Sequence, residues 1–259
     1  MNPLVAGSNP AGPTTLDPFD CVGDHGHALA NAIRDAVSHK NHEQLFVGID
    51  VGGQKKGFHA VAVRDFAILG KTSSCDPTEI ATWCEEIEAT VVAVDAPISW
   101  SSTGRARSAE RALMQAGISC FSTPTEKAAR EHPTNHFGWM LQGAKLYDAL
   151  DRSFARFDGN NEHTRPICFE TFPHAIACAL NGAPVSARNK SKVRRALLEK
   201  AGVSCELLQN IDFVDAGLCA LTAHCFARRL IEMFGDPLEG LIVVPSMVAT
   251  FEAHQAASC

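Results

Sequence analysis

Two apolar stretches of this chain each end in a single aspartate. Residues 45–53 are apolar up to Asp50 and then turn on two glycines. Residues 90–97 are apolar up to Asp95 and end in a proline. Runs that are apolar on both faces are typical of strands in the middle of a sheet that helices cover on both sides. We therefore expect both stretches at the centre of an α/β domain.

The remaining hydrophobic pattern predicts further elements around these two strands. Alternation of apolar and polar positions is typical of strands, whereas apolar positions three or four apart are typical of helices. The strands that this pattern predicts span 59–64, 67–69, 166–174 and 239–245. The helices that it predicts span 77–89, 105–116, 139–157, 189–202 and 216–234.

The composition divides the chain into three parts. Residues 1–44 are first rich in proline and glycine and then polar, and residues 5–14 back-translate to a stretch that resembles the T-arm of a transfer-RNA gene. We expect this part to be disordered or to lie upstream of the true translation start. Residues 45–246 are expected to form one domain, and residues 247–259 a loose tail.

Charge and cysteine content exclude several classes of protein. The net charge of -6 argues against a polycation that coats nucleic acid, so any such contact requires a local basic patch. The sequence has no apolar span of membrane length. The ten cysteines include no CxxC pair and no zinc-type spacing. We interpret them as small hydrophobic residues in a reducing cytoplasm.

The acidic residues at the ends of the predicted strands suggest a cation site. Asp50 and Asp95 would meet at the carboxyl ends of neighbouring parallel strands, where they repel each other unless a cation is shared. Asp212 and Asp215 are three residues apart and can point the same way from the first turn of a helix. Glu170 ends a third buried strand.

Each of these acids also has an interpretation without a metal. Asp50 can cap its own turn, and capping of the last helix explains either Asp212 or Asp215 but does not require both. Glu170 can instead pair with an arginine.

Basic residues follow the Asp95 strand directly. Arg107 and Arg111 lie one turn apart on one face of the predicted helix, from which they can contact phosphates of a substrate at the Asp95 edge. The alternative is pairing with Glu110 within the helix. A second basic run, residues 190–195, is either a solvated helix face or a further phosphate contact.

A combination of short motifs resembles the DUF429 family, a group described as predicted nucleases of ribonuclease H-like fold. The motifs are Gly48-Ile49-Asp50, Val94-Asp95-Ala96-Pro97, Gly104-Arg105-x-Arg107-x-x-Glu110-Arg111, Glu170-Thr171-Phe172-Pro173, Asp212-x-x-Asp215-Ala216 and Glu239-Gly240-x-Ile242-x-x-Pro245.

The resemblance implies a mixed sheet in which the first three strands form an antiparallel meander and two parallel strands follow. It also implies that Asp50, Asp95 and Asp215 converge. Asp212-x-x-Asp215-Ala216 further resembles the closing helix of Holliday-junction resolvases in this superfamily, whereas Glu170 falls on no standard superfamily position.

The activity that this implies is metal-dependent hydrolysis of nucleic-acid phosphodiesters, with DNA and RNA both open. Such a site holds two Mg²⁺ or Mn²⁺ ions about 4 Å apart. Asp50 would bridge them, Asp95 and Asp215 would each hold one ion, and Asp212 or Glu170 would support them or carry a proton. The residues expected to position the phosphate backbone are Arg105, Arg107, Arg111 and Lys55 or Lys56.

Two other functions remain open from the sequence. Residues 49–55 are similar to the first phosphate loop of the actin, Hsp70 and sugar-kinase superfamily, which would make the protein an ATP-dependent phosphotransferase. Members of that superfamily carry a second aspartate-glycine loop after a duplicated sheet, and the sequence shows none. The other alternative is a catalytically silent nucleic-acid-binding module of the same fold. The oligomeric state is open as well.

Overall fold

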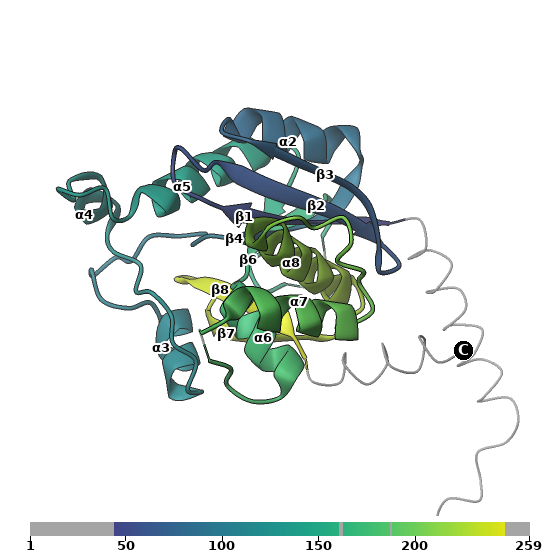
Figure 1. The fold of residues 1–259 in the computed structure, drawn as a ribbon. Helices are drawn as coiled ribbons and strands as arrows, with labels where there is room; N and C mark the ends of the chain where they lie inside the picture. Colours follow the sequence, from purple (N-terminus) through teal and green to yellow (C-terminus); the bar gives the residue numbers. More distant parts are fainter. Residues whose placement is uncertain (1–43, 161–162, 187, 247–259) are drawn as a thin grey trace, which may run out of the picture. The chain divides into compact units, whose positions relative to one another are not determined.

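The computed structural model describes residues 44–160, 163–186 and 188–246 (Figure 1). The predictions for residues 1–43 and for the tail at 247–259 lie outside the described residues. Among the helices of the described part, none has both the length and the hydrophobicity needed to cross a bilayer.

A mixed sheet forms the centre of this domain. Its first half is a meander in which β1 (Leu45–Val51) pairs antiparallel with β2 (Phe58–Arg64), and β2 pairs antiparallel with β3 (Ala67–Ser74). On its other side β1 pairs parallel with β4 (Ala89–Asp95). All side chains of β1 are buried, as its apolar sequence predicts.

The second half of the sheet continues the parallel direction from β4. Strand β6 (Ile167–Glu170) pairs parallel with β4, and β8 (Gly240–Pro245) pairs parallel with β6. Strand β7 (Ile231–Asp236) pairs antiparallel with β8 at the edge of the sheet. The order is β3-β2-β1-β4-β6-β8-β7, and the short β5 (Ala155–Arg156) pairs with β6. This confirms the predicted ribonuclease H-like arrangement of an antiparallel meander followed by parallel strands, although three parallel strands, β4, β6 and β8, follow where two were expected.

Helices cover both faces of the sheet (Figure 1). One face carries α2 (Pro77–Glu86) and α5 (Gly138–Leu150), whose buried residues pack on alternate positions of β1 and β4. The opposite face carries α8 (Ile211–Ala227), with α6 (Pro173–Asn181) and α7 (Lys190–Lys200) packed around it.

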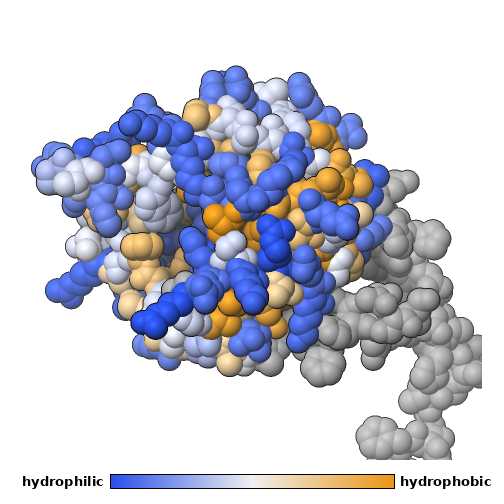
Figure 2. All heavy atoms as spheres, in the orientation of Figure 1, coloured by the Kyte–Doolittle hydropathy of each residue, from blue (hydrophilic) through white to orange (hydrophobic). Residues whose placement is uncertain are grey.

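Two shorter helices lie in the long connection between β4 and α5. They are α3 (Ser108–Gln115), which packs on β7, and α4 (Glu126–Arg130), which packs on α5. The face in Figure 2 is covered mainly by hydrophilic residues, with hydrophobic residues exposed between them near its middle. The apolar residues of the inner strands β1, β4, β6 and β8 are buried, whereas Leu69 of β3 and Met233 of edge strand β7 are exposed.

Two predicted helices are shorter than the sequence pattern suggested. The predicted helix at 216–234 ends at Ala227, because Arg229 adopts the left-handed conformation, and the following residues form edge strand β7. The predicted helix at 139–157 ends at Leu150, and the chain then pairs with β6 as β5. Helix α6, in contrast, was not predicted; its proline at the first turn is a helix-start signal that the strand interpretation of 166–174 obscured.

Candidate metal centre

Three neighbouring strands place polar side chains side by side at one end of the sheet. In the register of the sheet, Asp50 of β1 lies opposite His59 of β2 on one side and opposite Asp95 of β4 on the other. Because side chains alternate along a strand, Asp50 shares a face with Phe46 and Gly48, which is the face that α8 covers. The predicted meeting of Asp50 and Asp95 at neighbouring strand positions is therefore a feature of the fold.

Gly48 permits helix α8 to lie directly on β1. A Cβ atom at Gly48 would be 2.0 Å from the backbone nitrogen of Ala220 and 2.1 Å from the carbonyl oxygen of Ala216. At the start of this helix, the side chain of Asn210 accepts a hydrogen bond from the Phe213 amide at 2.9 Å. Since Asn210 is the cap, neither Asp212 nor Asp215 is needed for capping the helix.

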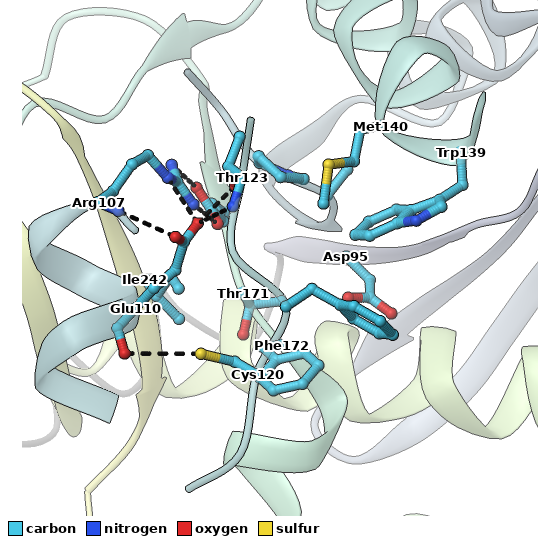
Figure 3. A pocket seen from close by; sticks show the side chains of 14 residues that line it. Asp95, Arg107, Glu110, Cys120, Thr123, Trp139, Met140, Thr171, Phe172 and Ile242 are labelled. Atoms are coloured by element: carbon cyan, nitrogen blue, oxygen red, sulfur yellow. Dashed lines mark hydrogen bonds and ion pairs between the residues drawn. The ribbon is translucent and has the colours of Figure 1, made fainter. Parts of the chain in front are cut away.

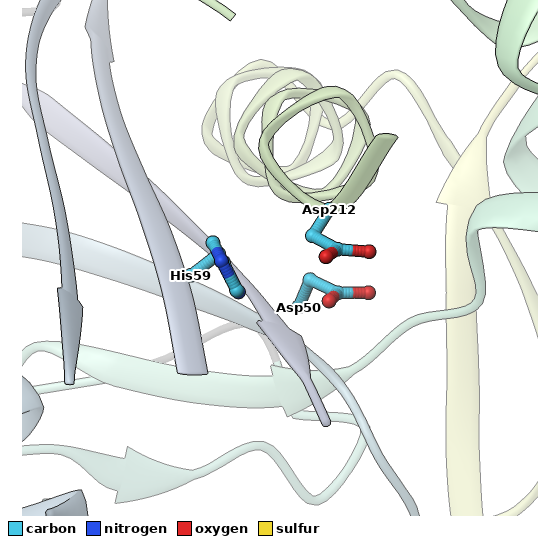
Figure 4. Close-up of side chains that lie close together, drawn as sticks. All are labelled: Asp50, His59 and Asp212. Atoms are coloured by element: carbon cyan, nitrogen blue, oxygen red, sulfur yellow. The ribbon is translucent and has the colours of Figure 1, made fainter. Parts of the chain in front are cut away.

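Asp50, His59 and Asp212 form a close group (Figure 4). One ligand atom from each residue lies within 4.8 Å of the others, and Figure 4 shows the carboxylates of Asp50 and Asp212 next to each other. The Lys56 ammonium group lies 2.6 Å from Asp212 Oδ1 and 3.5 Å from Asp50 Oδ2. The two aspartates therefore share a cation that the protein itself supplies.

The second acid of helix α8 has a cation of its own. Asp215 accepts a hydrogen bond from Arg194 of α7, with 2.5 Å between Nη1 and Oδ2. Both side chains are buried. Asp215 Oδ1 is also buried, and it has no hydrogen-bond partner among the described residues. Arg194 thus neutralises Asp215 on one side and leaves one oxygen available.

Burial and mutual repulsion make the ionised form of these carboxyls unfavourable. Burial raises the pKa of Asp50 to about 7, with Asp215 and Asp212 adding to the rise and Lys56 opposing it. Burial likewise raises the pKa of Asp95, as do the charges of Asp50 and Asp215, and burial raises the pKa of Asp215 against the effect of Arg194. The site therefore holds four carboxyl groups, those of Asp50, Asp95, Asp212 and Asp215, beside the two cations Lys56 and Arg194, and the raised pKa values favour protonation unless a further cation binds.

The donors available fit a divalent cation. Asp50 Oδ2 and His59 Nδ1 are both buried; among the described residues the former makes no hydrogen bond beyond its ion pair with Lys56 at 3.5 Å, and the latter makes none. Burial lowers the pKa of His59, so its imidazole is neutral at pH 7 and its nitrogens can act as ligands. Carboxylate oxygens suit Mg²⁺ and Mn²⁺, and an imidazole nitrogen favours Mn²⁺ of the two. That Asp50, Asp95 and Asp215 hold an ion together stays a prediction.

Glu170 has the alternative role that its sequence position left open. It lines the same pocket as Asp95 and Arg107, which are both labelled in Figure 3. Its Oε1 accepts from Arg107 Nη2 at 2.6 Å, and its Oε2 accepts from Arg107 Nη1 and from the Ile98 amide, both at 2.9 Å. The structure does not bring Glu170 into the group around Asp50. The reason is register, because Glu170 is level with Val94 of β4 and not with Asp95.

Arg107 is likewise engaged inside the protein. Besides Glu170, its Nε donates to Glu110 Oε1 at 2.9 Å, and its side chain is buried. Burial of Arg107 between two carboxylates corrects the expectation that it faces a phosphate. Arg105, Arg111 and Lys55 are exposed, and Arg111 lies 3.7 Å from Glu239.

His59 and Arg194 are site residues that the sequence analysis did not single out. In the hairpin of β1 and β2, His59 pairs with Asp50. The proximity of His59 to Asp50 could therefore have been predicted by counting residues outward from the turn. Arg194 appeared only as part of a basic run. Its neighbour Arg195 binds the carbonyl oxygens of Cys205 and Leu208, so this run is only partly a solvated face.

Comparison with known proteins gives a family and two structures. A family model described as "Protein of unknown function (DUF429)" matches residues 48–239. Two structures of RuvC from Thermus thermophilus, one in complex with Holliday junction substrate, are 17% identical and cover 72% of this chain and 96% of theirs, with TM-scores of 0.40 and 0.38. No curated protein matches the sequence. At this identity the likeness does not extend to function.

Proposed function

Because this chain belongs to the DUF429 family of proteins of unknown function, its activity has to be argued from the site, and we propose that it is a metal-dependent nuclease. The reaction is hydrolysis of phosphodiester bonds in DNA or RNA. Asp50, Asp212 and His59 hold a Mg²⁺ or Mn²⁺ ion, with Asp95 and Asp215 completing the set of ligands.

The observation that carries this proposal is the excess of buried carboxylate at one end of the sheet. Asp50 is only 5% exposed, and its pKa rises to about 7 although Lys56 lies 3.5 Å away. Keeping these carboxyls ionised costs stability, first because they are buried and then because they repel one another, and a divalent cation relieves both effects.

The chain's own residues have distinct roles in this proposal. Asp50 lies between Asp95 and His59, so it can contribute to an ion on either side. Arg194 fixes the orientation of Asp215, and Asn210 fixes the first turn of α8. When bound, the metal supplies an activated water and stabilises the leaving oxygen of the phosphodiester.

Basic side chains outside the carboxylate group are proposed to contact the phosphate backbone. Lys55, Arg105 and Arg111 are exposed, and Lys56 is half-exposed above the aspartates. Arg107 is left out because Glu110 and Glu170 occupy its guanidinium. Contacts to phosphates position a nucleic acid without selecting DNA or RNA, which is why both remain in the proposal.

A cleavage panel with and without the Asp50 carboxylate tests the proposal. The substrates are single strands, duplexes, DNA–RNA hybrids and four-way junctions, each with Mg²⁺, with Mn²⁺ and with EDTA. We expect cleavage that requires the metal and that falls at least about 100-fold in Asp50→Asn.

The matched control is Glu86→Gln, which removes one negative charge from an exposed position of α2 on the other face of the sheet. It should cleave at the wild-type rate. Metal-dependent cleavage that survives in Asp50→Asn would refute the assignment, as would cleavage lost equally in Glu86→Gln. Comparison of the melting temperatures of the variants separates loss of chemistry from loss of folding.

A further inference from the structure

Lys56 is held in place by the hairpin between β1 and β2. The turn is closed by hydrogen bonds from the Lys56 and Gly57 amides to the Gly53 carbonyl, both 2.9 Å, and from the Gly52 amide to the Gly57 carbonyl, 2.8 Å. A Cβ atom at Gly52 would lie 2.7 Å from Cδ and 2.8 Å from Cβ of Lys56. The stem of Lys56 therefore lies flat on the bare backbone of Gly52, which directs its ammonium group toward the two aspartates.

The ammonium group contacts the carboxylates of both Asp50 and Asp212. Lys56 Nζ lies 3.5 Å from Asp50 Oδ2 of β1 and 2.6 Å from Asp212 Oδ1 of α8. Its ion pairs therefore link two elements that no backbone hydrogen bond connects. The two cations of the site differ in burial, since the Lys56 side chain is 47% exposed and the Arg194 side chain 10%. Lys56 can therefore move from its carboxylates into water while the stem of its side chain stays where it is, whereas Arg194 would have to leave a buried position.

We propose that Lys56 is an exchangeable internal cation, which pairs with Asp50 and Asp212 in the metal-free protein and is displaced when a divalent ion binds there. This inference rests on the proposed function, because it concerns the same carboxylates. It goes further by stating that metal binding and the Lys56 ion pair exclude each other, so that Lys56 weakens metal binding and protects the fold when metal is scarce.

The first measurement is the affinity for Mn²⁺ by isothermal titration, without nucleic acid, at fixed ionic strength. The proteins compared are the wild type, Lys56→Gln and Lys55→Gln. Lys55 is exposed and adjacent, so its variant has the same change in net charge without loss of the ion pair. We expect Lys56→Gln to bind Mn²⁺ about tenfold more tightly or better, and Lys55→Gln to stay within about twofold of the wild type.

The second measurement follows Lys56 itself. Acetylation of surface lysines by a water-soluble reagent, analysed by mass spectrometry, reports whether the ammonium group is paired. Saturating Mg²⁺ should raise the acetylation rate at Lys56 at least about threefold and leave that at Lys55 unchanged, because an ammonium group released from two carboxylates is more accessible to the reagent.

The outcomes distinguish the inference from the proposed function. Equal Mn²⁺ affinity in the wild type and Lys56→Gln overturns the exchange and leaves the metal site standing. Tighter binding in Lys56→Gln without a change in Lys56 acetylation also overturns it, since Lys56 then repels the ion without leaving. Absence of Mn²⁺ binding in all three proteins overturns the metal site and the inference together. Lys56→Arg keeps the positive charge, so we expect it to bind Mn²⁺ as weakly as the wild type does.

Discussion

Gly48 and Ala220 are in contact through backbone atoms, so that a Cβ atom at Gly48 would lie 2.0 Å from the Ala220 nitrogen. This contact fixes the distance between strand β1 and helix α8. Asp50 is two residues beyond Gly48, and Asp212 and Asp215 are on the first turns of the helix. The geometry of the site therefore depends on a residue that carries no functional group.

Gly48→Ala should separate the helix from the strand. We expect a loss of at least about 2 kcal/mol in the free energy of unfolding, because the added methyl group meets backbone atoms that cannot rotate away. Urea denaturation measures it. The control is Gly53→Ala, where the added Cβ meets nothing within 4 Å and the backbone is not left-handed. Equal stability of the two variants would contradict the close approach.

Arg194 and Asp215 should be strongly coupled energetically. Arg194→Gln leaves a buried carboxylate without its cation, and we expect it to cost about 3–5 kcal/mol. Asp215→Asn should cost less, since it removes a carboxyl whose pKa burial already raises. In a double-mutant cycle, the double variant should be more stable than the sum of the single losses predicts. Strict additivity would mean that the ion pair contributes nothing.

Glu170→Gln distinguishes a structural role from a catalytic one. The carboxylate accepts two hydrogen bonds from the buried Arg107 and one from the Ile98 amide, so its neutralisation should cost about 2–4 kcal/mol in stability. Because Glu170 lies outside the group of Asp50, His59 and Asp212, the Mn²⁺ affinity should stay at the wild-type value. A fall in affinity with little loss of stability would instead return Glu170 to the site.

The central strands and their acids could be predicted from sequence because their signals are local. The apolar runs that end in Asp50 and Asp95 are uninterrupted. A short run that is apolar on both faces is typical of a strand in the middle of a covered sheet, so the pattern predicts its structure directly. The partners of the acids depend on register and on packing between distant elements, which no local pattern contains. Arg107 and Arg194 are both buried, although each lies in a polar stretch of the sequence. Sequence alone does not distinguish them from exposed arginines, because their burial depends on register and packing.

Helix α8 also contains a histidine that should make the fold sensitive to acid. His224 is 1% exposed and lies between the rings of Phe46 and Phe66, with centroid distances of 5.2 and 4.4 Å. Neither ring nitrogen has a hydrogen-bond partner among the described residues. The pKa of His224 is lowered to about 3, first by burial and then by the charge of Arg228, with Asp65 opposing the shift. In the folded protein the imidazole is therefore neutral over most of the acid range.

The unfolded chain takes up a proton at this histidine near its ordinary pKa of about 6.5, whereas the folded protein does not until about pH 3. The unfolded state thus binds more protons in that interval, so stability should fall as the pH is lowered through it, by roughly 3–5 kcal/mol from this group. His224→Leu should flatten this part of the curve of unfolding free energy against pH, and His136→Gln, at an exposed position, should leave it unchanged. If the unfolding free energy of His224→Leu falls as steeply with decreasing pH as that of the wild type, other groups cause the acid sensitivity.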